Sequence, residues 1–141
     1  MKRQVLLDTG PLVALVDARD RYHRWAIAQW GDIEPPLLTC EAVISEACFL
    51  LDQAAGGSAA VFQMLLREAV AIGFRLDEHL KEVDKLRTKY ADVPMSVADA
   101  SLVRMSEQFS RSAVLTLDDD FKVYRKHGRY VIPLLSPHTS R

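Results

Sequence analysis

The chain has 141 residues, 49% of them hydrophobic and 26% charged, a balance that fits a folded globular domain and excludes a disordered or fibrous chain. Its 18 Lys and Arg residues nearly match 19 Asp and Glu residues, for a net charge of −1. Any nucleic-acid contact must therefore come from a local basic patch. No stretch reaches the ~20 apolar residues of a membrane span, and the first apolar run is too short for a signal peptide. We expect one cytoplasmic domain over residues 1–141, with Cys40 and Cys48 reduced, at or near the core.

Short apolar runs alternate with longer segments of helical periodicity, a pattern that predicts a parallel sheet built from βαβ units. Pro11 suits a first helical turn, and Asp77 and Ser96 suit helix N-caps. In chain order we expect a strand at Gln4–Leu7, helices from Pro11 to Val16 and at Arg21–Trp30, a strand at Leu37–Cys40, a helix at Glu41–Gln53, a break at Ala55–Ser58, a helix at Ala59–Ala71, a strand at Gly73–Leu76, helices at Glu78–Tyr90 and Val97–Phe109, a strand at Ala113–Leu117, a short helix after Asp119 and a strand at Val131–Leu134. The expected fold is a three-layer α/β/α sandwich with a central, mostly parallel sheet of four to five strands.

Two aspartates follow predicted strands that lie more than a hundred residues apart. Asp8 follows the first strand, and Asp118 follows the strand at Ala113–Leu117. Ligands of open parallel sheets bind beyond the carboxyl ends of the strands, so both residues are candidate ligands. Asp8 alone also fits a turn or cap aspartate. In the triplet that Asp118 opens, Asp119 and Asp120 fit an N-cap and solvated first-turn acids.

Two further acids lie within predicted helices. Glu46 is about a third of a turn away from the polar face of its helix, in an arc of apolar residues where a glutamate serves little purpose as a solubiliser. Asp99 has the spacing of a capping box with Ser96. A helix N-terminus also favours negative charge, so capping and metal binding are compatible there. Oxygen-only ligands of this kind point to Mg²⁺ or Mn²⁺.

With these acids in this order, the chain resembles the PIN-domain metallonucleases, particularly the VapC-type toxins of bacterial and archaeal toxin–antitoxin pairs. The resemblance runs from about Val5 to Leu135 and rests on VLLDTGPLVAL, ISEACFLL, DVPMSVADASLV and VLTLDDDFKVYRKHGR. It implies an endoribonuclease dependent on Mg²⁺, with Mn²⁺ as an alternative. The implied catalytic residues are Asp8, Glu46, Asp99 and Asp118, with Asp120 and Thr116 as accessory positions.

Within that set, we expect Asp8, Asp99 and Asp118 to contact the metal. Glu46 would orient a ligand or act as the base for the attacking water. The resemblance also implies a homodimer and a small cognate antitoxin that blocks the acidic cleft. The helices at Ala59–Ala71 and Arg21–Trp30 are candidates for an interface, or they are simply core.

Contact with RNA needs basic groups near the acidic site. One candidate stretch holds Arg19, Arg21 and Arg24 with Tyr22 and Trp25, and the other runs from Lys122 through Arg125 to Arg129 with Tyr124. Basic residues interleaved with aromatic ones suit single-stranded RNA. Solvated helix faces with core aromatic residues are the competing interpretation, above all for Trp25.

Other phosphoryl-transfer families fit the sequence poorly. A haloacid-dehalogenase-like phosphatase needs a second aspartate two residues after the first, where this chain has Gly10. A phosphorelay receiver domain needs an acidic pair before the first helix, which is missing. The alternative that stays open is a catalytically silent module of the same fold that binds RNA or a partner protein, and only an activity assay separates it from a nuclease.

Overall fold

The computed structural model describes residues 3–53 and 57–138 and has the expected α/β architecture. Five strands form one parallel sheet in the order β3-β2-β1-β4-β7. In this sheet the strands are β1 (Gln4–Leu7), β2 (Leu37–Thr39), β3 (Val70–Ile72), β4 (Ser112–Leu115) and β7 (Leu134–Leu135). A separate antiparallel pair joins β5 (Arg125–Lys126) to β6 (Tyr130–Val131).

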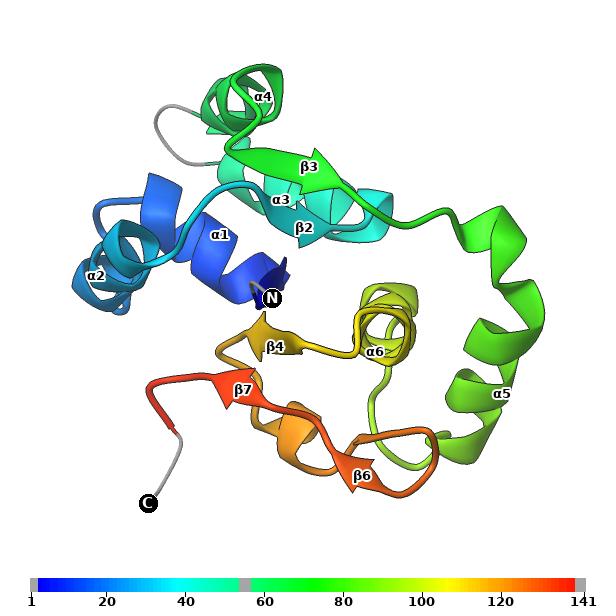
Figure 1. The fold of residues 1–141 in the computed structure, drawn as a ribbon. Helices are drawn as coiled ribbons and strands as arrows, with labels where there is room; N and C mark the ends of the chain where they lie inside the picture. The colour runs from blue at the N-terminus through cyan, green and yellow to red at the C-terminus, as the bar shows by residue number, and fades with distance from the viewer. Residues whose placement is uncertain (1–2, 54–56, 139–141) are drawn as a thin grey trace.

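Helices cover both faces of the sheet. In Figure 1, α1 (Thr9–Val16) and α2 (His23–Asp32) lie on one side, and α6 (Val97–Gln108) lies on the other with α5 (Leu80–Lys89) outside it. Near the β3 edge, α3 (Glu41–Leu51) packs against α4 (Gly57–Leu66). The three-layer α/β/α prediction is thereby confirmed. None of the described helices is long and apolar enough to cross a membrane.

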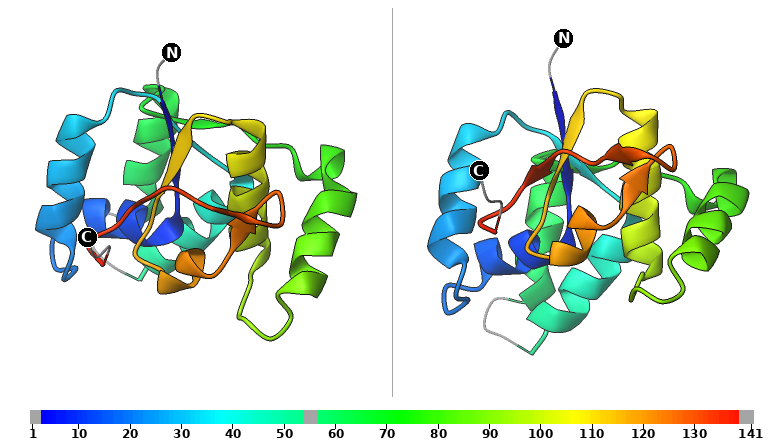
Figure 2. Two further views of the ribbon diagram at one scale, coloured as in Figure 1. Left: turned by 60° about the horizontal axis from the view of Figure 1, so that its bottom comes forward. Right: turned by 90° about the horizontal axis from the view of Figure 1, so that it is seen from below.

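The two central strands are buried on both faces, which explains why they appear in the sequence as continuous apolar runs. Leu6 and Leu7 of β1 have no exposed surface, and all four residues of β4 are buried. These strands pair in register from Gln4 with Ser112 to Leu7 with Leu115. Residues that follow Leu7 and Leu115 therefore emerge side by side at the same end of the sheet (Figure 2).

The predicted strand at Gly73–Leu76 is wrong, because the strand lies earlier, at Val70–Ile72, and α4 ends at Leu66. The chain turns at Glu68, which has a left-handed backbone with φ 61°. Helices usually end in this way at glycine or asparagine, so a glutamate gave no stop signal. Phe74, placed in the predicted strand, is instead buried and stacks on His79.

Three other predicted boundaries also differ. A 3-10 turn, η1 (Leu76–Glu78), precedes α5, and Asp77 pairs with Arg75 at 2.9 Å instead of capping that helix. The predicted strand at Val131–Leu134 divides into β6 and β7 around Pro133, whose ring nitrogen has no hydrogen to donate to a neighbouring strand. The short helix after Asp119 is a 3-10 helix, η2 (Asp119–Lys122). Of the predicted break at Ala55–Ser58, residues 55 and 56 lie outside the described part of the chain.

Candidate active site

A cleft of about 640 Å³ opens at the carboxyl ends of β1 and β4. The four acids singled out in the sequence all line it, each from a different element. Asp8 follows β1 and caps α1, Glu46 lies in the middle of α3, Asp99 lies in the first turn of α6, and Asp118 caps η2 after β4. The remaining lining residues are Thr9, Gly10, Val13, Asp20, Arg21, Tyr22, Leu50, Ser96 and Leu117.

Thr116 joins two of these acids through hydrogen bonds. Its hydroxyl, fully buried, donates to Asp8 Oδ2 at 2.7 Å and accepts the amide N–H of Asp118 at 2.9 Å. Asp8 Oδ1 accepts the N–H of Thr9 at 2.8 Å, so both of its carboxylate oxygens are oriented. Gly10 permits the close approach of α1 to this strand end, because a Cβ there would lie 3.1 Å from the side chain of Leu117. Thr116 thus acts on the cleft through the acids that it orients.

Asp99 forms the capping box that the sequence predicts. Its amide donates to Ser96 Oγ at 3.0 Å, and its Oδ2 accepts the amide N–H of Ser96 at 3.1 Å. Tyr124 Oη lies 3.4 Å from the same carboxylate oxygen and donates to the carbonyl of Pro94 at 3.0 Å. Asp99 is buried, and its orientation is set by residues on both sides of the helix start.

Glu46 is different from the three aspartates because its side chain is exposed at the cleft wall. The apolar arc around it in the helix does not bury it. The Glu46 side chain is therefore open to solvent beside the less exposed aspartates.

The buried carboxylates of the cleft resist ionisation. The pKa of Asp8 is raised to about 7, chiefly by burial and also by the negative charges of Asp99 and Asp118, against the lowering effect of the hydrogen bonds from Thr116 and Thr9. Burial likewise raises the pKa of Asp99, with a contribution from the charge of Asp118. Burial and the two preceding aspartates raise the pKa of Asp120, whose N–H donates to Asp118 Oδ1 at 2.9 Å. Without a cation, Asp8 is therefore mostly protonated below pH 7.

The donor set fits a hard divalent cation in its chemistry, since it consists of carboxylate and hydroxyl oxygens. In the cleft wall, Thr9 Oγ1 is buried with no hydrogen-bond partner, as expected where another polar group belongs. Within residues 3–53 and 57–138, however, no three Asp, Glu, His or Cys side chains lie close enough together to hold a metal ion as they stand. Binding would therefore require side-chain rotation toward a common point.

Comparison with known proteins agrees with this fold. The family model for the PIN domain matches residues 5–127. The chain belongs to the PIN domain family. Among solved structures, Mycobacterium tuberculosis VapC20, a Sarcin-Ricin loop cleaving toxin, is similar with a TM-score of 0.77 and 20% identity, over 92% of this chain and all of that one. At this identity the likeness bears on the fold alone. Comparison with curated proteins gave no match.

Of the basic residues predicted to contact RNA, Arg21 lines the cleft of this PIN domain. Arg19 and Arg24, from the same stretch, are exposed. Lys122 pairs with Asp119 at 3.2 Å and donates to the carbonyl of His138, and the guanidinium of Arg125 donates to three backbone carbonyls, those of residues 122 to 124. Contact between these five residues and RNA stays a prediction, and Arg125 has a competing structural role.

The aromatic residues predicted to accompany the basic ones behave unequally. Tyr124 is fully buried, so the prediction that it lies among RNA-contacting residues is wrong. Trp25 packs partly buried against the core, as the competing interpretation expected. Only Tyr22 lines the cleft, and its neighbour Asp20 lines it also. Asp20 and the contact from Tyr124 to Asp99 were missed, since no spacing in the sequence marks a contact between remote elements.

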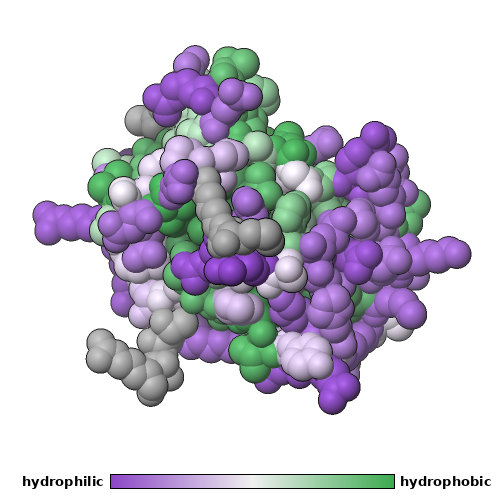
Figure 3. Space-filling model, in the orientation of Figure 1, coloured by the Kyte–Doolittle hydropathy of each residue, from purple (hydrophilic) through white to green (hydrophobic). Residues whose placement is uncertain are grey.

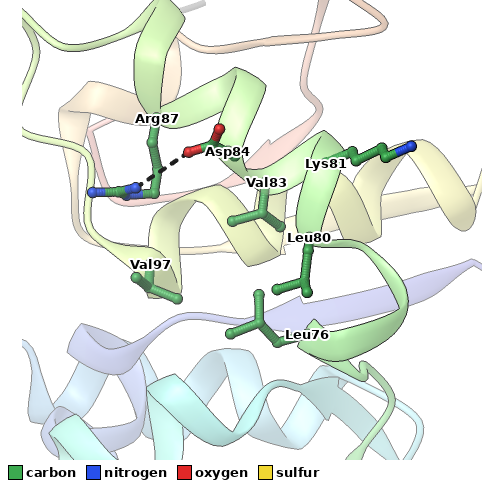
Figure 4. Close-up of a pocket in the computed structure, with 7 residues that line it drawn as sticks. All are labelled: Leu76, Leu80, Lys81, Val83, Asp84, Arg87 and Val97. Atoms are coloured by element: carbon green, nitrogen blue, oxygen red, sulfur yellow. Dashed lines mark ion pairs between the residues drawn. The ribbon is translucent and has the colours of Figure 1, made fainter.

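A second cavity, of about 470 Å³, is a poor candidate for catalysis. Leu76, Leu80, Val83 and Val97 point into it between η1, α5 and the start of α6 (Figure 4). Its one carboxylate, Asp84, already pairs with Arg87 at 3.6 Å. The lining is mainly aliphatic, and its single carboxylate among the described residues is already paired, so it provides no set of oxygen ligands for a metal ion.

The raised pKa of Asp8 predicts a specific dependence of stability on pH in the metal-free protein. A folded-state pKa of about 7, against the model-compound value of 3.8, means that the folded state retains a proton that the unfolded state has lost. This group therefore lowers the free energy of unfolding as pH rises from about 4 to about 7. Between pH 5 and pH 8, Asp8→Asn should gain stability relative to wild type by roughly 2–3 kcal/mol in chelator, measured by urea unfolding.

The matched control is Asp32→Asn, which removes an exposed carboxylate at the end of α2. Its pH profile should follow that of the wild type. A stability difference between Asp8→Asn and wild type that does not change with pH would contradict the account of a charged, buried Asp8.

Proposed function

We propose that this PIN domain is a divalent-metal-dependent endoribonuclease and acts as the toxin of a toxin–antitoxin pair. The observation that carries the proposal is the convergence of four acids from four elements on one cleft, among them a buried aspartate whose pKa is raised to about 7. Membership of the PIN domain family supports nuclease chemistry, and the fold shared with VapC20, a Sarcin-Ricin loop cleaving toxin, supports RNA as substrate. We also propose that the protein acts on RNA in the cytoplasm. Residues 1–141 would form a single nuclease domain.

The proposed cofactor is Mg²⁺, with Mn²⁺ as the alternative, held by Asp8, Asp99 and Asp118. When bound, such a cation offsets the carboxylate charge, attracts the phosphate and lowers the pKa of a bound water. The chain contributes the arrangement of the ligands: Thr116 orients Asp8 and the Asp118 backbone, and Ser96 with Tyr124 orients Asp99.

Glu46 is the proposed proton acceptor for the attacking water, or else the acid that orients a ligand. Its exposed side chain at the cleft wall permits either role. As a base, Glu46 takes a proton from the water while the water oxygen forms its bond to phosphorus and the leaving oxygen departs. Asp120 and Thr116 remain accessory in this proposal, because both act through Asp118 or Asp8.

A catalytically silent module that binds RNA or a partner is the second candidate. It is favoured by one observation, that no three acids of the described chain converge closely enough for a metal ion as they lie. The two candidates share a fold and differ in one property, which is turnover.

We also propose a homodimer and a small protein antitoxin as partners. Exposed apolar side chains on and beside α3 and α4 support a protein contact there, namely Phe49, Phe62, Leu66 and Ile72. Figure 3 shows hydrophobic atoms over α4, at the top of the view, and a mostly hydrophilic surface over α5. Of the two helices that the sequence offered as interfaces, α4 exposes two large apolar side chains, Phe62 and Leu66, and α2 exposes one, Ile27. A molar mass of one chain in light scattering would contradict the dimer.

Cleavage of total RNA by the purified protein tests the enzymatic proposal. We expect cleavage in Mg²⁺, none in chelator, and a loss of at least about 100-fold in Asp99→Asn, because even partners that only support a metal ligand are worth about 10- to 100-fold. Asparagine can still accept the Ser96 N–H, so the variant should fold. Asp92→Asn, at an exposed position before Pro94, should cleave like wild type. Metal-independent cleavage, or equal activity of Asp99→Asn, would overturn the proposal.

The role of Glu46 is tested by Glu46→Gln, which keeps the shape and removes the charge. Loss of a general base should lower kcat by about 10²–10⁴-fold with little change in Mg²⁺ affinity. Glu41→Gln provides the control, because Glu41 is an exposed glutamate in the first turn of the same helix and lies outside the cleft. If Glu46→Gln retains both the turnover and the metal affinity of wild type, Glu46 has neither role.

A further inference from the structure

Two adjacent residues before α2, Arg21 and Tyr22, line the cleft and differ in chemistry from its acids. Among the described residues that line the cleft, Arg21 is the single cation and Tyr22 the single aromatic side chain. The Arg21 guanidinium lies over the Tyr22 ring, 5.2 Å from its centroid. A cation paired with an aromatic ring suits a nucleotide, whose phosphate is anionic and whose base has a flat face.

The Tyr22 backbone is fixed on both sides. Its N–H donates to Asp20 Oδ1 at 2.8 Å, and its carbonyl accepts the N–H of Ala26 at 2.9 Å. The next residue, His23, is tied through Nδ1 to the carbonyl of Ala14 in α1 at 2.7 Å. The loop is therefore anchored to the helix that Asp8 caps.

The Tyr22 side chain is held by a residue from the far end of the described chain. Tyr22 Oη and His138 Nε2 are hydrogen-bonded at 2.9 Å, and the rings meet edge to face with centroids 5.5 Å apart. His138 Nδ1 lies 3.3 Å from Asp119 Oδ1, and Lys122 Nζ binds both Asp119 and the His138 carbonyl. Asp119 directly follows Asp118. His138, which holds the Tyr22 ring, therefore also contacts the segment that carries the proposed catalytic acid Asp118.

From this geometry we propose that Tyr22 is a stacking surface for an unpaired base of single-stranded RNA, held in position by His138. The proposal rests on the proposed function, because it places the base beside the phosphate that the acids would cleave. A ring already fixed at its backbone and hydroxyl loses little conformational freedom when a base stacks on it. Arg21 lies where it can contact the adjacent phosphate. His138 is a positioning residue that acts through Tyr22.

The chain contains a matched control for this pair. Arg129 lies over Tyr130 at 5.4 Å from the ring centroid, almost the distance of the Arg21–Tyr22 pair. Tyr130 is exposed on β6 and does not line the acidic cleft. A difference between the two tyrosines therefore reports the cleft and excludes a general effect of an exposed Arg–Tyr pair.

The test measures binding in Mg²⁺ by fluorescence anisotropy, in an Asp99→Asn background so that the RNA stays intact. Two probes are compared, a short single-stranded RNA and an abasic oligomer with the same number of ribose phosphates. The Kd of the abasic oligomer divided by the Kd of the RNA isolates the contribution of the bases, because both probes carry the same charge. Tyr22→Ala should reduce this ratio by about tenfold, the size of one base–aromatic stack.

The other variants assign the effect. Tyr22→Phe keeps the ring and should reduce the Kd ratio by only about two- to threefold, and His138→Ala should do the same. The double variant should reduce the ratio no more than either single variant, because both substitutions remove the same contact. Tyr22→Leu, which keeps an apolar side chain, serves if Tyr22→Ala does not fold. Tyr130→Ala should leave the ratio unchanged.

An unchanged ratio in folded Tyr22→Ala or Tyr22→Leu overturns the proposal, and so does a parent protein that binds the two probes equally or neither. A lower melting temperature without a change in the ratio means that Tyr22 only anchors the C-terminal segment. Wild-type cleavage is scored separately. If the Kd ratio depends on Tyr22 but the wild-type protein does not cleave RNA, the stacking proposal holds and the nuclease proposal fails. If the wild-type protein cleaves RNA but the ratio does not depend on Tyr22, the nuclease proposal holds and the stacking proposal fails.

Discussion

The hydroxyl of Thr116 connects the ends of the two central strands, and the candidate site depends on that connection. It donates to Asp8 after β1 and accepts the Asp118 amide after β4, in a fully buried position. Because the two strands pair in parallel and in register, Asp8 and Thr116 directly follow the paired strand ends, and Asp118 lies two residues beyond Thr116. The same arrangement brings like charges together out of water, which costs free energy unless a proton or a cation compensates. The raised pKa of Asp8 is the direct sign of that cost.

Around this pair the other elements serve distinct purposes. The α6 capping box fixes Asp99 by satisfying the helix start, so one set of hydrogen bonds both stabilises the helix and aims the acid. The hydroxyl of the buried Tyr124 lies 3.4 Å from the same carboxylate. Glu46 is exposed at the cleft wall, and the Arg21–Tyr22 pair lines the same cleft. The cleft thus combines oriented, less exposed acids with more exposed residues. This combination suits a site in which the acids bind a cation and the exposed residues bind a polymer.

Local signals in the sequence were sufficient wherever a single element decided the outcome. β1 has its predicted bounds, the Ser96–Asp99 capping box forms, and Asp8 directly follows its strand as predicted. The strand predicted at Ala113–Leu117 ends earlier, at Leu115, so Asp118 lies three residues past its end. Prediction failed where the deciding contact was remote or the signal atypical. Glu68 ended α4 without glycine, and Pro133 divided an apolar run into β6 and β7. Tyr124 looked like a surface aromatic among basic residues, yet it fills the core beneath Asp99. The link from Tyr22 to His138 spans 116 positions, and no periodicity could reveal it.

The most direct test is the number of protons released when the cleft binds Mg²⁺ or Mn²⁺, from calorimetry in buffers of different ionisation enthalpy. A carboxylate must ionise to bind a metal, so a group with a pKa of about 7 gives up its proton on binding at lower pH. The account predicts release of close to one proton from Asp8 near pH 6, a decline toward zero above pH 8, and loss of that share in Asp8→Asn. Absence of cation binding, or binding with the same proton release in wild type and Asp8→Asn, would contradict it.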